Sequence, residues 1–294
     1  MSTLSPHELA RPDATIRYWT GGPVGAPTLV LLHGATLDHR AWAPQTEALL
    51  DRFHVVVPDL RAHGRSTGHF DFHAAVDDVL ALLERLPAGH VVLVGLSLGG
   101  NLAQEAVRRA PDRVHAVVVA DATCNAAARH PLAASITATA LSAHAMLPGD
   151  HFARHAARTI AVDPQVQRYA LEVNAHRPNR ETVRILSSLL TDALRHEPDY
   201  RLPVPALLVH GQLDQIGDIT TGTRAWARRE PLAEYAVIPG AGHASNLDNP
   251  EAFTAALIGF LERVLPQAAV AEPPSGAESA EEPHRRDERE PGTG

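Results

Sequence analysis

Residues 91–101 read VVLVGLSLGGN. The first four are apolar and mostly β-branched, which predicts a short buried strand, and the glycines that follow predict a tight turn before a helix over residues 98–110. A strand, a glycine-rich turn and a helix can bind a phosphate group, or they can hold a serine hydroxyl above the end of the strand. The role of Ser97 therefore depends on what the rest of the chain places beside this turn.

Short apolar runs alternate with helical patterns through most of the chain. Strands are predicted at residues 28–32, 53–57, 91–94, 116–120, 206–209 and 235–238, and helices at 41–51, 72–86, 98–110, 223–229 and 250–265. Continuous apolar strands separated by helices are typical of an α/β fold, in which helices flank both faces of a mostly parallel twisted sheet. Residues 16–19 are expected to add an antiparallel strand at the edge of this sheet.

Two segments depart from this alternation. Residues 123–202 contain no convincing strand and are interrupted by prolines, among them Pro131, Pro148, Pro164 and Pro178. Because a plain loop of that length is rare in a compact domain, we expect an inserted cap of about four short helices, and a core domain made of residues 1–122 and 203–266. Residues 267–294 carry seven acidic residues against three arginines and have no aromatic side chain. They are expected to form a disordered acidic tail.

Composition limits the classes of function. The chain of 294 residues has a formal net charge of -8 and contains no lysine, which argues against a nucleic-acid partner. No run reaches the roughly 18 apolar residues of a membrane span, and no secretory signal opens the chain, so a cytoplasmic protein is expected. Among the 18 histidines, His69 and His73 could share a helix face, but HFDFH lacks the glutamate of a HEXXH zinc motif. No metal site is predicted.

A nucleotide site is one alternative for the GLSLGG turn. The dinucleotide-binding fingerprint requires glycine where this chain has Ser97, although Asp121 does end the next predicted strand, where such a site needs an acid. A Walker A loop would continue into GK[ST], and this sequence does not. The pattern G-x-S-x-G between a strand and a helix fits the turn better.

This G-x-S-x-G turn, residues 95–99, resembles the nucleophile elbow of the α/β-hydrolase fold family, and the resemblance extends over about residues 28–265 outside the cap. It implies a nucleophile at Ser97, followed along the chain by an acid and then by a histidine base. Asp214, in LLVHGQLDQIGD, and His243, in IPGAGHASNL, take those two places after late strands. Asp121 is an alternative acid, because some members of the fold supply it from the strand after the elbow.

The same resemblance implies two backbone N–H groups that stabilise an oxyanion. One is the N–H of Leu98, directly after the nucleophile. The other is the N–H of Ala35, in LLHGATLDHRAW, which is similar to the HG loop of the family, and His33 is expected to order that loop. Residues 59–66 resemble the D-x-R-G-x-G-x-S turn of the family, with Ala62 where glycine is usual.

These residues predict a cofactor-independent serine hydrolase that cleaves a carboxylic ester or a lactone through an acyl-enzyme intermediate. Serine at the nucleophile position argues against the dehalogenase and epoxide-hydrolase reactions, which use aspartate there in this family. Thioester hydrolysis, carbon–carbon bond hydrolysis, perhydrolysis and lyase chemistry stay open, and so does a ligand receptor without catalysis. The alanine-rich, aliphatic cap favours a small, partly apolar substrate.

Overall fold

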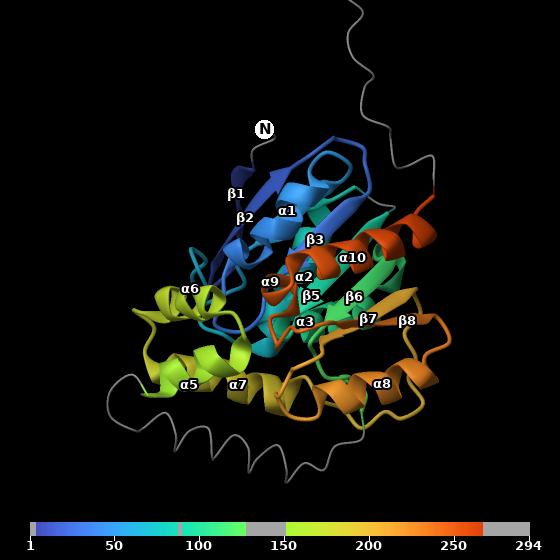
Figure 1. Cartoon of the computed structure of the whole chain (residues 1–294). Coiled ribbons are helices and arrows are strands. Elements are labelled where there is room, and N and C mark those ends of the chain that lie inside the picture. Colours follow the sequence, from blue (N-terminus) through green and yellow to red (C-terminus); the bar gives the residue numbers. More distant parts are fainter. Residues whose placement is uncertain (1–3, 88–89, 128–150, 267–294) are drawn as a thin grey trace, which may run out of the picture.

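A computed structural model describes residues 4–87, 90–127 and 151–266. Within these residues eight strands form one sheet in the order β1-β2-β4-β3-β5-β6-β7-β8 (Figure 1). All neighbouring pairs from β4 to β8 are parallel, whereas β1 and β2 run antiparallel to their neighbours. The strands are β1 (Ser5–Ala10), β2 (Thr15–Gly21), β3 (Thr28–Leu32), β4 (His54–Pro58), β5 (Val91–Leu96), β6 (Ala116–Ala120), β7 (Ala206–Gly211) and β8 (Ala233–Ile238).

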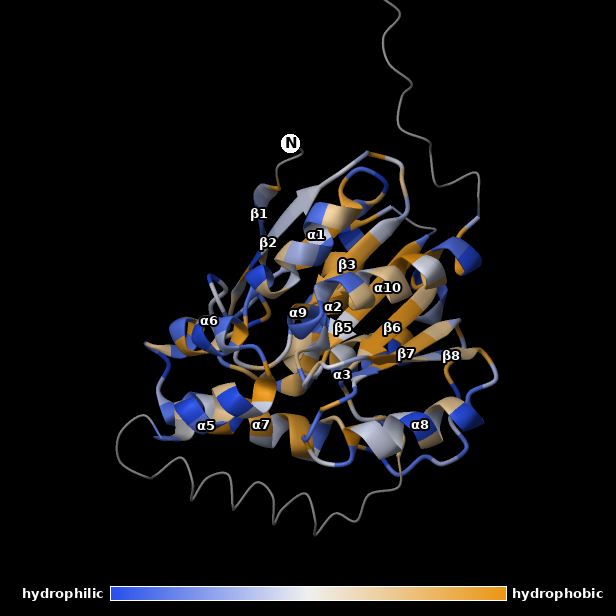
Figure 2. Cartoon of the chain, viewed as in Figure 1, coloured by the Kyte–Doolittle hydropathy of each residue, from blue (hydrophilic) through white to orange (hydrophobic). Residues whose placement is uncertain are grey.

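Helices cover both faces of the sheet, so the predicted α/β fold class is confirmed. On one face α2 (Phe72–Arg85), α3 (Leu98–Arg109) and α8 (Ile219–Arg229) pack on the side chains of Val30 and Leu32 and their neighbours. On the other face α1 (Ala43–Leu49) and α10 (Pro250–Val264) pack on a layer that includes Leu29 and Leu31. Successive side chains of a strand point to opposite faces, and Figure 2 shows the central strands as predominantly hydrophobic. Burial on both faces explains why these strands are continuous apolar runs.

The edge of the sheet differs from the prediction. The expected antiparallel strand at residues 16–19 exists as β2, but β1 lies outside it and forms the edge, with Leu9 opposite Ile16. β1 could not be recognised in the sequence because Leu9 is its only buried residue and Pro6 stands near its start. An exposed edge strand lacks the apolar pattern on which strand prediction relies.

The other helices lie in the connections that follow the strands, and those between β6 and β7 are called the cap below. Three of them, α5 (His151–Ile160), α6 (Pro164–Asn174) and α7 (Asn179–Asp192), lie between β6 and β7 in the chain. The remaining ones are η1 (His39–Trp42), η2 (Pro111–Arg113) and α9 (Ser245–Asp248). The prediction of about four cap helices also involves residues 128–150, which lie outside the described residues, as does the predicted tail. Among the described helices none is both long and apolar enough to cross a bilayer.

Candidate active site

Ser97 lies at the turn between β5 and α3. Its φ of 52° and ψ of -115° are unfavourable for a residue with a side chain. The turn is tight, since a Cβ atom on Gly95 would lie 2.3 Å from the carbonyl oxygen of Gly99, and one on Gly99 would lie 2.1 Å from that of Leu32. The chain can turn this sharply only with glycine at these two positions. The half-buried Ser97 is thereby held at the carboxyl end of β5.

Two helical glycines provide a test of this tight packing. We expect Gly99→Ala to lower the free energy of unfolding by at least about 2 kcal/mol, because the backbone of β3 would have to move away from the new methyl group. Gly222→Ala, inside α8, is the matched control, since its Cβ atom would meet no atom closer than 3.8 Å. It should leave the stability unchanged or raise it by up to about 1 kcal/mol. Urea denaturation of both variants measures the difference; equal effects would contradict the packing argument.

The structure brings together the three residues that the sequence singled out. The Nε2 atom of His243 lies 2.8 Å from the Ser97 Oγ atom, and its Nδ1 atom lies 2.9 Å from Asp214 Oδ2. His243 and Asp214 are buried and come from the loops that follow β8 and β7. The second oxygen of Asp214 accepts a hydrogen bond of 2.8 Å from the Ile216 N–H. With Nδ1–H donating to the carboxylate, Nε2 is left to accept the proton of the Ser97 hydroxyl.

Burial and the neighbouring carboxyl groups change the pKa of His243 in opposite directions. Burial lowers the pKa of its imidazole, but the hydrogen bond and negative charge of Asp214, together with the charge of Asp121, raise this pKa. The net result is a pKa above the ordinary value for histidine. The imidazolium that forms when His243 takes a proton is therefore stabilised mainly by Asp214, and also by Asp121 when that carboxyl group is ionised.

Asp121, the alternative acid, does not form a hydrogen bond with His243 but binds other groups near it. It directly follows β6, has a φ of 48° and is buried. Its Oδ1 atom accepts a hydrogen bond of 2.7 Å from the Gly211 N–H, and its Oδ2 atom accepts one from the Ser245 hydroxyl. Burial raises the pKa of Asp121 to about 7. Asp121 thus joins the end of β7 to the start of α9, which directly follows the loop that carries His243, whereas Asp214 contacts the imidazole itself.

The two expected oxyanion donors lie on segments that approach Ser97. A Cβ atom on Gly34, which precedes Ala35, would lie 3.5 Å from the Ser97 Cβ atom, so the loop after β3 packs beside the elbow. Leu98 is the first residue of α3, and the first N–H groups of a helix have no acceptor within it. Among the described residues the Ala35 N–H donates no hydrogen bond.

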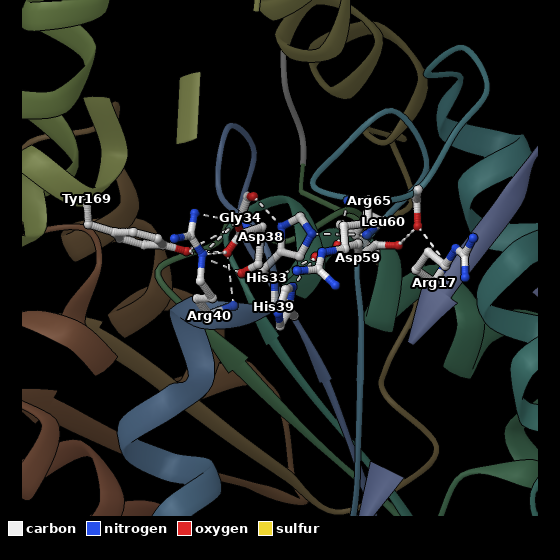
Figure 3. Close-up of polar contacts among 11 residues, drawn as sticks. Arg17, His33, Gly34, Asp38, His39, Arg40, Asp59, Leu60, Arg65 and Tyr169 are labelled. Carbon is white, nitrogen blue, oxygen red and sulfur yellow. Dashed lines mark hydrogen bonds and ion pairs between the residues drawn. The ribbon is translucent and has the colours of Figure 1, made fainter. Parts of the chain in front are cut away.

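A buried polar network fixes the loop that carries Ala35 (Figure 3). The Nδ1–H of His33 donates to the carbonyl of Gly34 at 2.8 Å, and its Nε2 atom accepts from the Leu60 N–H at 3.0 Å. Because burial lowers the pKa of His33, the ring is neutral and can make both contacts. The carboxylate of Asp59 accepts hydrogen bonds from the backbone N–H groups of His39 and Arg65. His33 therefore orders the loops after β3 and β4, as the sequence indicated.

The cap also contacts this loop, and no sequence motif pointed to these contacts. The Tyr169 hydroxyl of α6 donates to Asp38 Oδ1 at 2.8 Å, and Figure 3 shows its side chain reaching across to the loop. Arg40 binds the same carboxylate. The Asn174 Nδ2 atom donates to the Thr36 carbonyl at 2.6 Å. Tyr169 and Asn174 are each more than 130 residues from the loop residue that they contact, which leaves no local signal in the sequence.

Comparison with known proteins agrees with this architecture. Residues 27–250 match the family described as alpha/beta hydrolase fold. The 2-(acetamidomethylene)succinate hydrolase of Mesorhizobium japonicum is 28% identical over 80% of this chain and 88% of its own length. The 3-oxoadipate enol-lactonase 1 of Acinetobacter baylyi is 27% identical over 86% of this chain and 96% of its own.

The fold of this chain is also similar to that of a solved structure. A thermophilic esterase from Thermogutta terrifontis superposes with a TM-score of 0.74 at 26% identity. The match covers 90% of this chain and 99% of the esterase. The sheet order, the tight turn at Ser97 and the family match agree, and the chain therefore belongs to the α/β-hydrolase fold family.

Proposed function

We propose that the protein is a serine hydrolase that cleaves a carboxylic ester or a lactone of a small molecule. The observation that carries this proposal is the continuous chain of hydrogen bonds from Ser97 through His243 to Asp214. A serine hydroxyl is a weak nucleophile near neutral pH, and a histidine oriented by a carboxylate is the usual means of activating it. The relatives named as an esterase and an enol-lactonase support an acyl-oxygen bond as the one that is broken.

The reaction follows from the positions of these groups. His243 Nε2 takes the hydroxyl proton while Ser97 Oγ attacks the acyl carbon, and the N–H groups of Ala35 and Leu98 stabilise the negative oxygen of the tetrahedral intermediate. The acyl-oxygen bond breaks as His243 returns its proton to the leaving oxygen. His243 then takes a proton from water, the resulting nucleophile attacks the acyl-enzyme, and Ser97 regains its proton. With a lactone, the leaving oxygen stays attached to the acyl group.

A non-catalytic receptor is the second function that the fold could serve. Nothing in a binding site for a neutral ligand requires a strained serine aligned with a buried histidine and carboxylate. Strain and buried charge both destabilise a fold, and such features are typical of catalytic sites. The intact arrangement therefore favours the enzyme over the receptor.

Covalent labelling tests this choice. We expect a fluorophosphonate probe to label the folded protein at one site, and the labelling to disappear in Ser97→Ala because the Oγ atom that would attack phosphorus is missing. Ser5→Ala, at an exposed position of β1, is the control and should be labelled like the wild type. A panel of p-nitrophenyl esters and simple lactones should be hydrolysed by the wild type and the control. A folded wild-type protein that neither labels nor hydrolyses any of them would exclude the proposed function.

A further inference from the structure

A small cavity separates the cap helices from the loop that carries Ala35. It has a volume of about 30 Å³, and apolar side chains of α5, including Ala157 and Ile160, form part of its wall. The polar lining includes Thr36, Asn174 and Arg177. A cavity needs about 10–15 Å³ to hold one water molecule. The volume of this cavity therefore accommodates two polar atoms of about the size of a water oxygen. Thr36 directly follows Ala35, so the cavity begins next to the proposed oxyanion donor.

Arg177 brings a positive charge without a salt-bridge partner to this cavity. Its Nη1 atom is buried and has no hydrogen-bond partner, while its Nη2 atom donates to the Ala62 carbonyl at 3.2 Å. Throughout the described ranges no carboxylate is ion-paired with Arg177, since the nearby Asp38 binds Arg40 and Tyr169. Burial lowers the pKa of Arg177, against the attraction of Glu181 and Asp38. A buried N–H group of a cation without an acceptor is costly, so a ligand that accepts from the Nη1 atom of the half-buried Arg177 would be bound favourably.

The floor of the cavity is strained and held from two sides. Thr36 has a φ of 64°, which is a rare conformation for a β-branched residue. Its N–H donates to His63 Nε2 at 3.3 Å, and its carbonyl accepts from Asn174 Nδ2 at 2.6 Å. Burial, followed by the charge of Arg177, lowers the pKa of His63 far below the ordinary value, which keeps Nε2 able to accept. Strain that is maintained by neighbours in this way is typical of binding and catalytic sites.

We propose that this cavity binds a carboxylate of the substrate, so that the enzyme prefers an ester or lactone that carries a free carboxyl group. The inference rests on the proposed hydrolase function and adds the substrate class. A guanidinium binds the two oxygens of a carboxylate in a planar arrangement, and the space matches two such atoms. The buried Oδ1 atom of Asn174, which also lacks a partner, can accept from an adjacent O–H or N–H group of the ligand.

The position of the cavity also limits the size of the substrate. Ala35, the proposed oxyanion donor, and Thr36, which lines the cavity, are consecutive residues. Their Cα atoms are therefore about 3.8 Å apart. We therefore expect a carboxylate in the cavity to be separated from the reacting carbonyl by only a few carbon atoms. The carboxyl group can belong to the acyl part or to the alcohol part of the ester, and the substrates below distinguish these two sources.

Matched charged and neutral esters test the proposal. The acyl pair is mono(4-nitrophenyl) glutarate and 4-nitrophenyl pentanoate, and the alcohol pair is 4-carboxyphenyl butyrate and phenyl butyrate. We expect the wild type to prefer the charged ester in one pair, which identifies the source of the carboxylate. In Arg177→Gln the ratio of kcat/KM between charged and neutral ester should fall about tenfold to a hundredfold in that pair, because one charge-assisted contact is lost.

The control variant is Arg180→Gln, which removes an exposed arginine of α7 and should leave both ratios within about twofold of the wild type. Inhibition of the wild type by glutarate, compared with uncharged glutaramide, needs no variant and should favour the dicarboxylate. Equal losses on charged and neutral esters in Arg177→Gln, or no preference for charge in either pair, would overturn the carboxylate site. Failure of the wild type to hydrolyse any ester would instead overturn the hydrolase function itself.

Discussion

Replacing Ser97 with alanine is expected to lower kcat for ester hydrolysis by about 10⁴-fold to 10⁶-fold, since the acyl-enzyme can no longer form. His243→Ala should cost nearly the same, because Ser97 Oγ then has no group that accepts its proton at 2.8 Å. The residual rate of both variants reflects substrate binding and the two backbone donors. Neither substitution removes an N–H group, so the oxyanion contacts remain.

The double variant makes this prediction sharper. If Ser97 and His243 act as one unit, Ser97→Ala with His243→Ala should be no slower than either single variant. Single-turnover measurements with a 4-nitrophenyl ester, with KM determined separately, measure the loss in the chemical step. Losses that multiply in the double variant would show that the two side chains act independently, contrary to the hydrogen-bonded chain. Circular dichroism of all three variants verifies that the fold is retained.

The central sheet could be predicted because its strands carry their own signal. Residues 28–32 and 116–120 were predicted with the bounds that β3 and β6 have, since burial on both faces makes every position apolar. Helix starts were less certain: the segment predicted at residues 223–229 begins at Ile219, after Asp218. β1 was missed because an exposed edge has no such pattern. Strand prediction therefore located the strands whose burial is complete, found only part of the partly buried β2 and β8, and missed the most exposed strand.

In the candidate site, too, residues that belong to short sequence patterns could be predicted, whereas contacts between residues far apart in the chain could not. The glycines around Ser97 and the histidine after the last strand are local patterns, and a chain with parallel strands brings the ends of those strands to one edge of the sheet. The cap contacts could not be found in this way. Asn174 meets Thr36, and Arg177 meets Ala62, across more than 110 residues with no repeated spacing between them. Such pairs depend on how the cap packs, which no short window of sequence encodes.

The choice between the two acids shows what geometry adds. Both Asp121 and Asp214 follow strands of the sheet and both are buried near His243. Asp214 is hydrogen-bonded to the imidazole at 2.9 Å, whereas Asp121 binds the Gly211 N–H and the Ser245 hydroxyl. The sequence favoured Asp214 without excluding Asp121, because the direction of a carboxylate at the end of a strand depends on the loop that follows.

Asparagine substitutions at the two positions should therefore differ strongly. We expect Asp214→Asn to lower kcat about 10³-fold to 10⁴-fold, because a neutral amide neither stabilises the imidazolium nor selects the Nδ1–H tautomer. Asp121→Asn should stay within about tenfold of the wild type, since an amide can still accept from Gly211 and can donate to the Ser245 oxygen. A larger loss in Asp121→Asn than in Asp214→Asn would instead assign the role of the acid to Asp121.

The pH profile of the same variants separates the role of Asp214 from a structural one. His243 must be neutral to accept a proton, so kcat/KM of the wild type should rise with pH through a pKa above 6.5. Burial alone lowers this pKa, and the hydrogen bond and charge of Asp214 are the largest factors that raise it. In Asp214→Asn the rising limb should therefore move to lower pH, while the maximal rate falls. Measurements between about pH 5 and pH 9 follow this limb; a limb that stays in place, or moves to higher pH, would mean that Asp214 does not stabilise the protonated form of His243.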